Sequence, residues 1–494
     1  MVKLYAMDQL IKLHKIRLSS PSDEDRRADE QRISDALGIK GLEIPVSVLR
    51  KIHLHGNGLS CVVAGYRGGH RLIDVAATAS YSVALDIGTT NLAASLYDNV
   101  SGEVVSEVKL ENPQISFGSD ILTRMHHAML GKEEEVSRLL IEGVNIAIRK
   151  LCDDAGISAR DIHALVAAGN TVMSHFFLGL DVSRIPVAPY VPVVRKPGFF
   201  NAAELGINMN PEALVYVFPN AGSYVGGDII AGIIVSGMFD SDEVSVLIDV
   251  GTNAEIVIGN RDWLLVGAGA AGPALEEGIA GIGKRAESGI IYDVRMRGRE
   301  MECRTFNNAP PEGICGSGMV SLIYEMYSAG IIGNDGILDS GHEGVNVIDG
   351  VMTYTLPCAQ ASGLSIKQTE IDNFLRSKAA MFTLLLVMLR SVGLTFGDIK
   401  KVYVAGALGN GIDAGKAAGI GMLPAWSPDV IVPLGNASLR GAQMILKDSG
   451  LLALEDEITD SITYKHMHDD PEFMKEFRGA IFIPHTNPEI LKVQ

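Results

Sequence analysis

Two stretches far apart in the chain, "YSVALDIGTTNL" at residues 81–92 and "VSVLIDVGTNAE" at residues 244–255, repeat one pattern. In each, apolar and partly β-branched residues predict a buried strand, and the aspartate, glycine and polar residues that follow predict a tight turn into a second strand. The glycine lets the backbone approach a bound group, the N–H groups and polar side chains can donate to phosphate oxygens, and the aspartate can hold a cation. Two such turns facing each other predict a phosphate-binding site. The turns supply Asp86, Gly88, Thr89, Thr90 and Asn91, and Asp249, Gly251, Thr252 and Asn253.

Length and composition indicate an ordinary globular protein with more than one domain. A chain of 494 residues is too long for one core, so two or three domains are expected. With 47% hydrophobic residues, the chain can bury a sizeable core without metals or disulfides. The net charge of −17, from 59 acidic and 42 basic residues, predicts that nucleic acid and anionic membranes are not partners.

The longest apolar stretches are too short to cross a bilayer. Residues 228–239 and 379–389 fall below the roughly 20 residues that a spanning helix needs, so they predict buried helices. In the first 20 residues, charges interrupt the apolar residues every few positions, unlike the central segment of a secretory signal. We therefore expect a cytoplasmic protein.

The cysteines are scattered, and none forms a C-x-x-C pair. Zinc and iron–sulfur sites usually need closely spaced thiolates. The sequence therefore predicts neither in this chain. The five cysteines are Cys61, Cys152, Cys303, Cys315 and Cys358.

Residues 1–80 differ from the rest and predict a small α+β module. The Ser and Asp residues before "EDRRADEQRISDAL" predict the N-cap of a helix, and Gly38 predicts its end. The following segment predicts a hairpin around Arg67-Gly68-Gly69.

The remainder reads as two similar halves, at residues 81–243 and 244–494. Each opens with a strand hairpin and continues into helices, with a long helix at 133–156, a buried strand at 163–170 and a second long helix at about 370–393. This order predicts an internally duplicated α/β protein with a cleft between its halves.

The order of five segments resembles that of the actin, sugar kinase and heat-shock chaperone superfamily. The first phosphate loop lies at residues 86–90, a helix opens near Asp228, the second phosphate loop lies at 249–253, an adenosine turn lies at 405–410, and a closing helix runs from Asn436. The resemblance implies a duplicated actin-like (ribonuclease H-like) α/β fold whose halves close on Mg-ATP.

More narrowly, the chain resembles the reductive activators of corrinoid-dependent enzymes, ATPases that help return inactive cobalt(II) to cobalt(I). The resemblance covers residues 18–485 and rests on "PSDEDRRADEQRI", "FGSDILTR", "AGNTVMSHFFLGLD", "VAPYVPV", "GDIIAGI", "GPALEEGIAGIGKRAESG", "GICGSGM", "YVAGALGNGID" and "IFIPHT". It implies a corrinoid protein or a corrinoid-dependent methyltransferase as partner, and a homodimer is left open. Activators of this type carry an iron–sulfur domain, and this chain lacks four clustered cysteines. Either a separate ferredoxin-like protein supplies the electron, or this chain couples ATP to something other than its own electron transfer.

The resemblance also assigns roles to single residues. Asp86 and Asp249 would hold Mg²⁺ through waters, because Mg²⁺ dehydrates reluctantly. Asp228, 21 residues before Asp249, would position the attacking water. The phosphates would contact Gly88, Thr89, Thr90, Asn91, Gly251, Thr252 and Asn253, and the nucleoside side would involve Gly272, Glu276, Gly316, Ser317, Gly318, Gly406, Ala407 and Gly409.

Simpler interpretations stand beside these. "VGAGAAG" at residues 266–272 matches a dinucleotide fingerprint, but it follows the second phosphate hairpin and predicts only a tight turn beside the nucleotide. "GICGSGM" at residues 313–319 is equally a closely packed helix start, and His175 is expected to be structural. At the level of function, a small-molecule kinase and a nucleotide-binding chaperone or scaffold of the same superfamily are the alternatives to the activator.

Overall fold

The computed structural model describes residues 8–18, 22–52, 58–223, 225–251, 254–269, 281–284, 287–298, 300–406, 411–467 and 470–493. The chain divides into two compact units. The first unit consists of Met1–Val235 and Ala437–Ser461, and the second of Ser236–Asn436 and Ile462–Gln494. The expected boundaries did not include the return of Ala437–Ser461 to the first unit. The division into three domains stays a prediction.

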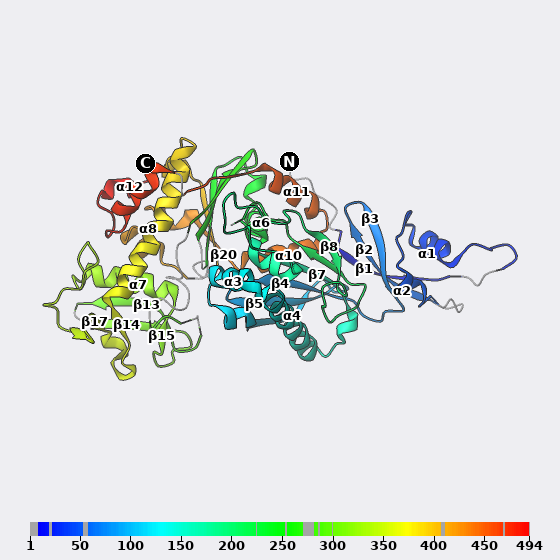
Figure 1. Ribbon diagram of the computed structural model, residues 1–494, viewed down its shortest axis with the longest axis horizontal. Coiled ribbons are helices and arrows are strands. Elements are labelled where there is room, and N and C mark those ends of the chain that lie inside the picture. The colour runs from blue at the N-terminus through cyan, green and yellow to red at the C-terminus, as the bar shows by residue number, and fades with distance from the viewer. Residues whose placement is uncertain are drawn as a thin grey trace. The chain divides into compact units, whose positions relative to one another are not determined.

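The first unit begins with a small three-stranded antiparallel sheet in the order β1-β2-β3 (Figure 1). Its elements are β1 (Ile11–Ile16), α1 (Asp29–Leu37), α2 (Val46–Leu49), β2 (Leu59–Tyr66) and β3 (Gly69–Val75). Arg67 and Gly68 have positive φ angles of 49° and 76°, the geometry of a two-residue hairpin turn. The predicted hairpin is therefore confirmed.

For helix α1, the predicted end is confirmed and the predicted start needs correction. Helix α1 ends at Gly38, which has a φ of 69°, as predicted. Its start is different, because Ala28 occupies the N-cap and no side chain caps the helix there. Strand β1 was not predicted, because its charged residues hide the alternation that marks a strand.

The main sheet of the first unit has six strands in the order β6-β5-β4-β7-β9-β8. These are β4 (Tyr81–Ile87), β5 (Asn91–Asp98), β6 (Val104–Glu111), β7 (Ile162–Gly169), β8 (Gly198–Asn201) and β9 (Leu214–Val217). Strands β4, β5 and β6 form an antiparallel meander, and β7 and β9 run parallel to β4. The carboxyl ends of β4, β7 and β9 therefore meet at one edge of the sheet.

Helices cover both faces of this sheet (Figure 1). They include η1 (Pro113–Phe117), α3 (Ile121–His127), η2 (Ala128–Lys132), α4 (Glu133–Ala155), α5 (Thr171–Leu178), α6 (Gly227–Ser236), α10 (Ala437–Lys447) and α11 (Leu451–Ser461). Helix α4, predicted from its apolar spacing, packs against β5 and β6 and shares a core with Leu96. Helix α10 lies on the opposite face, because its Gln443 donates to Ser95, the neighbour of Leu96 along β5.

The second unit repeats this arrangement in its six-stranded sheet, ordered β20-β19-β10-β11-β12-β21. The strands are β10 (Ser245–Val250), β11 (Ala254–Asn260), β12 (Trp263–Gly269), β19 (Lys401–Gly406), β20 (Ile431–Gly435) and β21 (Ile462–Tyr464). Again a meander is followed by two parallel strands, β19 and β20. The predicted internal duplication is confirmed.

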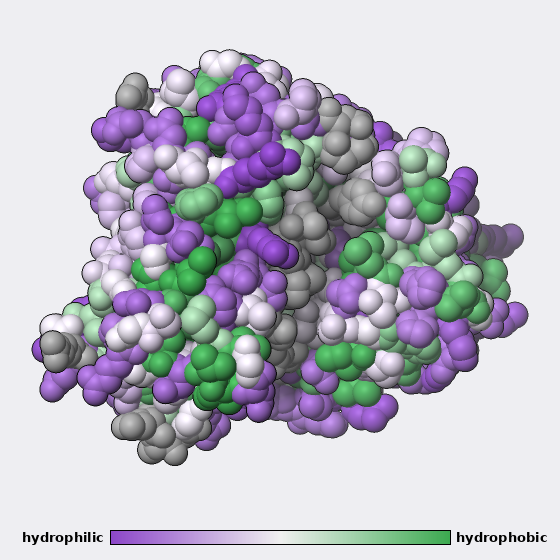
Figure 2. Space-filling model, turned by 60° about the vertical axis from the view of Figure 1, so that its left-hand side comes forward, coloured by the Kyte–Doolittle hydropathy of each residue, from purple (hydrophilic) through white to green (hydrophobic). Residues whose placement is uncertain are grey.

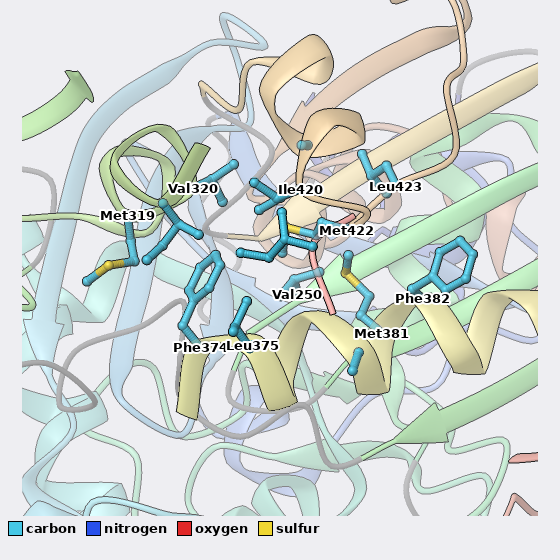
Figure 3. Packing of buried hydrophobic residues seen from close by; sticks show 14 of the residues in the cluster. Val250, Met319, Val320, Phe374, Leu375, Met381, Phe382, Ile420, Met422 and Leu423 are labelled. Carbon is cyan, nitrogen blue, oxygen red and sulfur yellow. The ribbon is translucent and has the colours of Figure 1, made fainter. Parts of the chain in front are cut away.

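The long helix expected at about 370–393 is α8 (Gln368–Ser391), and it packs against β11 and β12. Its apolar face enters the core of the second unit. Figure 3 shows part of this core, in which the labelled side chains are Val250, Met319, Val320, Phe374, Leu375, Met381, Phe382, Ile420, Met422 and Leu423. Helix α12 (Pro471–Ala480) packs on α8.

Two small sheets extend the second unit. Their elements, with the neighbouring helices, are β13 (Ile290–Arg297), β14 (Glu300–Thr305), β15 (Gly313–Ile314), α7 (Gly316–Ser328), β16 (Val345–Ile348), β17 (Val351–Thr355), η6 (Pro357–Ser362), β18 (Ser365–Lys367) and α9 (Ala414–Gly419). Lys416 ties α9 to β13 and α7 through ion pairs of 2.9 Å with Asp293 and 3.1 Å with Glu325. A disulfide joins Cys303 in β14 to Cys358 in η6, with the Cα atoms 5.8 Å apart. This pairing was not predicted, because the two cysteines lie 55 residues apart in the sequence.

Among the described residues, no helix combines the length and the apolar character that a membrane crossing requires. Residues 228–239 and 379–389 instead contribute to the buried helices α6 and α8, as predicted. The face in Figure 2 carries hydrophilic side chains interspersed with hydrophobic ones. In the same described part of the chain, no three His, Cys, Asp or Glu side chains are grouped so that they could hold a metal ion.

Candidate functional site

The first predicted phosphate loop lies at the carboxyl end of β4, the central strand of its sheet. Asp86 is paired with Ala93 in β5 and with Ala168 in β7, one residue before β4 ends. The chain then turns at Gly88, where a side chain would come within 2.4 Å of the carbonyl oxygen of Asn91. Only glycine therefore fits this tight turn. The predicted approach of Gly88 to a bound group stays a prediction.

Two asparagines that the sequence analysis did not single out support this loop. Asn170, at the end of β7, donates from Nδ2 to Oγ1 of Thr89 over 3.1 Å. Asn112, after β6, donates from Nδ2 to the carbonyl oxygen of Gly88 over 3.0 Å, and from its backbone N–H to that of Thr90 over 2.9 Å. The side-chain contacts span 81 and 24 residues of sequence, so no local pattern could have revealed them.

Helix α6 begins beside the same loop, close to Asp228. A side chain at Gly226 would come within 2.4 Å of Cα of Asn170, and one at Gly227 within 2.4 Å of Cβ of Phe218. The two glycines therefore let the helix start directly against the ends of β7 and β9. This places Asp228 at the sheet edge that carries the first predicted phosphate loop.

Asp86 and Asp228 are near enough to influence each other's charge. Burial, and then the negative charge of Asp86, raises the pKa of Asp228 to about 6. The N–H of Ile229 donates to Oδ1 of Asp228 over 2.8 Å and opposes this shift, because it stabilises the carboxylate. A carboxylate with such a pKa can orient a water and accept its proton near neutral pH.

The second predicted phosphate loop follows β10 in the second unit. Asp249 lies one residue before the end of β10, between β11 and β19. Gly406, at the end of β19, has a φ of 73°, and a side chain there would come within 2.6 Å of Oδ1 of Asp249. Gly251 directly follows β10, whereas Thr252 and Asn253 lie outside the described residues. The structure thus brings Asp249 and Gly406 together.

A cavity of about 730 Å³ opens at the carboxyl ends of β19 and β20. Its described lining is mainly apolar. Among the described lining residues only Asp413 is charged, and it caps α9 by accepting the N–H of Lys416 over 3.0 Å. Such a wall suits a nucleoside better than a phosphate. The predicted contacts Ala407 and Gly409 lie outside the described residues. The lining residues are Val404, Gly411, Ile412, Asp413, Ala414, Gly415, Pro428, Ile431, Pro433, Leu434 and Gly435.

The "GICGSGM" segment begins helix α7 near this cavity. Oγ of Ser317 would lie 3.9 Å from a side chain at Gly411, a lining residue. Gly318 has a packing role, because a side chain there would come within 2.2 Å of the carbonyl oxygen of Ile291 in β13. Gly316 opens the helix, and its contact with nucleotide stays a prediction, as does that of Ser317 and Gly318. Gly272 and Glu276 lie outside the described residues.

The residues of the first loop fit a hydrated Mg²⁺. Oδ1 of Asn91 is buried and has no hydrogen-bond partner within the described part of the chain. A buried acceptor of this kind needs a donor, and water bound to Mg²⁺ is one. Asp86 and Asp228 supply negative charge at the same sheet edge, which favours a cation there.

Comparison with known protein families agrees with this geometry. A family model described as the C-terminal domain of RACo, the ASKHA domain, matches residues 243–494. The chain belongs to the RACo family. A second model, the RACo middle region, matches residues 81–241. The duplicated sheets therefore form the actin-like fold that the sequence predicted.

Individual RACo relatives cover most of the chain. The corrinoid activation enzyme RamQ of Eubacterium limosum is 28% identical over 83% of this chain and 72% of its own length. The Co(II) methylated amine-specific corrinoid protein reductase of Methanosarcina barkeri is 24% identical over 78% of this chain and 74% of its own. The solved structure of a reductive activator for corrinoid, iron–sulfur protein is 33% identical and matches with a TM-score of 0.92, covering 99% of this chain and 81% of that one.

Proposed function

We propose that this protein is an ATP-hydrolysing activator of a corrinoid protein or a corrinoid-dependent methyltransferase, which assists the reduction of cobalt(II) to cobalt(I). One structural observation carries the ATPase part. Asp86 and Asp249 occupy equivalent positions, one residue before the ends of β4 and β10, and each lies two residues before a glycine, Gly88 or Gly251. The corrinoid part is supported by the named activities of the RACo relatives.

In this proposal each loop of the chain contributes a different part of the chemistry. The first loop and the second loop would donate to the phosphates, and Asp86 and Asp249 would hold Mg²⁺ through waters. Bound Mg²⁺ would neutralise negative charge on the phosphates. Asp228 orients a water against the γ-phosphorus and accepts a proton, while the bond from that phosphorus to the ADP oxygen breaks. The cavity beside β19 and β20 takes the nucleoside.

ATP hydrolysis would drive a conformational change that the corrinoid partner senses. The electron itself would come from a separate ferredoxin-like donor. Phosphoryl transfer to water needs positioning and charge neutralisation but no redox group, so the two tasks can reside in different proteins.

The proposal is tested by measuring steady-state hydrolysis of Mg-ATP with and without purified corrinoid proteins held as cobalt(II), together with cobalt(I) formation by absorbance. We expect ATP hydrolysis by the protein, and cobalt(I) formation that requires protein, ATP and an added reductant. Cobalt(I) formation that is independent of ATP would refute the proposal. A phosphorylated small molecule as the product would instead identify a kinase.

A further inference from the structure

Three buried polar side chains connect the first phosphate loop to helix α3. Asn112, Gln114 and Arg124 are all 0% exposed. Arg124 ends the phrase "FGSDILTR", for which the proposed reaction supplies no role. Charged side chains are almost never fully buried unless they are paired, so the position of Arg124 requires a physical reason.

The hydrogen bonds run in order from the loop to the helix. Nδ2 of Asn112 donates to the carbonyl oxygen of Gly88 over 3.0 Å and to Oε1 of Gln114 over 3.3 Å. The same oxygen of Gln114 accepts from Nη1 of Arg124 over 3.2 Å. Arg124 belongs to α3, so one connected set of contacts links the loop to that helix.

Neighbouring backbone groups fix this set in place. Nε2 of Gln114 donates to the carbonyl oxygen of Val136 in α4 over 3.0 Å, and Nε of Arg124 donates to that of Gly118 over 2.9 Å. Nη2 of Arg124 is buried without a partner within the described residues. Burying this cation is therefore costly, and an apolar side chain would fill the space more cheaply. A role in orienting the side chain of Gln114 would explain why a guanidinium is buried at this position.

The peptide geometry shows what the contacts would do for the loop. Asn112 binds the carbonyl oxygens of both Gly88 and Thr90. A trans peptide is planar, with its oxygen and its N–H on opposite sides. Fixing these two oxygens therefore turns the N–H groups of Thr89 and Asn91 away from Asn112. The bound carbonyl oxygens are also kept from facing the negatively charged phosphates.

We propose that Asn112, Gln114 and Arg124 are positioning residues for the ATPase, which set the first phosphate loop and couple it to helix α3. This inference rests on the proposed ATP binding. It predicts that the three residues affect ligands with phosphates but not adenosine. Damage to the fold as a whole would affect both kinds of ligand.

The first test is Asn112→Asp, which keeps the side-chain size and the acceptor for the N–H of Gln114 but replaces the donor that binds Gly88. We expect affinity for Mg-ATP and kcat/KM to fall at least about tenfold, because a buried acceptor loses its partner. Adenosine affinity should stay unchanged. The matched control is Asn145→Asp, because Asn145 also donates to a glycine carbonyl, that of Gly206, over 3.0 Å, but on the surface of α4. It should change neither quantity more than about twofold.

The second test acts at the far end of the contacts. Arg124→Lys keeps the charge but cannot bind both Gln114 and Gly118 in the same way. We expect a loss of about fivefold or more in kcat/KM for ATP, without a change in adenosine affinity. The control is Arg138→Lys, an exposed arginine that pairs with Glu142. In the wild-type protein, Mg-ATP should slow amide hydrogen exchange in α3.

The outcomes separate this inference from the proposed function. Wild-type protein that binds no Mg-ATP would refute the ATPase proposal itself. Wild-type protein that binds Mg-ATP would refute only the positioning role if the variants match their controls, or if they lose ATP and adenosine affinity equally. Should the variants not fold, unchanged exchange in α3 when the wild type binds Mg-ATP overturns the coupling.

Discussion

At the scale of single residues, Asp228 yields the most specific prediction. Asp228→Asn removes the carboxylate that we propose accepts a proton from water, a role that would act in the transition state. We expect kcat for ATP hydrolysis to fall about 100-fold or more, while ATP affinity changes less than about threefold. Asp153→Asn, on the exposed surface of α4, is the control. Equal losses in kcat and affinity would make Asp228 a binding residue instead.

The pH dependence follows from the same carboxyl. The pKa of Asp228 is raised to about 6, first by burial and then by Asp86, and the ionised form is the one that accepts a proton. Hydrolysis should therefore be full above this pKa and decline as the pH falls through about 6. A profile of kcat/KM against pH checks this, and the acidic limb should disappear in Asp228→Asn. An acidic limb that persists in the variant would belong to another group.

The two loop aspartates make a paired prediction. Asp86→Ala and Asp249→Ala each remove one negative charge that would hold hydrated Mg²⁺. We expect Mg²⁺-dependent ATP hydrolysis to fall at least about 100-fold in each variant, with the circular dichroism spectrum unchanged. Titration with Mg²⁺ at constant ATP should show a higher requirement. Normal turnover in both variants would exclude the assignment of the duplicated loops.

At the scale of elements, one buried carboxyl attaches helix α11 to the first unit. Tyr216 in β9 donates its hydroxyl to Oε2 of Glu455, which is 0% exposed. Oε1 of Glu455 has no partner among the described residues. Burial raises the pKa of Glu455 to about 8. The helix is therefore held by a carboxyl that stays protonated at neutral pH.

This carboxyl makes stability depend on pH in a defined direction. Between the ordinary value of 4.5 and about 8, the unfolded chain has lost the proton and the folded chain keeps it. Raising the pH in this window lowers the free energy of unfolding by up to about 1.4 kcal/mol per unit. Glu455→Gln should remove this slope, whereas Glu457→Gln, on the exposed side of α11, should retain it. Thermal unfolding of the wild type, Glu455→Gln and Glu457→Gln from pH 5 to 9 provides the measurement. If the stability of all three proteins changed with pH by the same amount, the assignment to Glu455 would be contradicted.

The sequence predicted the elements whose patterns are local. The strand, turn and strand at residues 81–92 and 244–255 could be predicted from the sequence, because a buried central strand is continuously apolar and its turn needs glycine. Strand β1 was not predicted, because its alternation of apolar and polar residues is short and breaks at Lys15. The roles of Asn112 and Asn170 beside the loop were not predicted for a different reason. Their role depends on strand order, which brings residues to the loop that carry no signal in their own neighbourhoods.

At the scale of the whole molecule, we predict from the cysteines that the chain holds no iron–sulfur cluster of its own. Cys303 is paired with Cys358, and Cys61 and Cys152 are buried. We expect the purified 494-residue chain to be colourless, and cobalt(I) to form only when an electron donor is added. Iron and sulfide analysis after anaerobic purification, followed by assays with and without an artificial reductant, tests this. Stoichiometric iron would show that the chain holds a cluster of its own.

The return of Ala437–Ser461 to the first unit has a consequence for how the protein is made. Helix α10 packs on β4, β5 and β7, strands that are synthesised hundreds of residues earlier. At about 5–20 residues per second, a ribosome needs roughly 11–45 seconds to go from residue 235 to residue 461. During that time the face of the nascent sheet that α10 later covers lacks this helix. A chain stopped before residue 437 would keep this apolar face permanently and would be a natural client for chaperones.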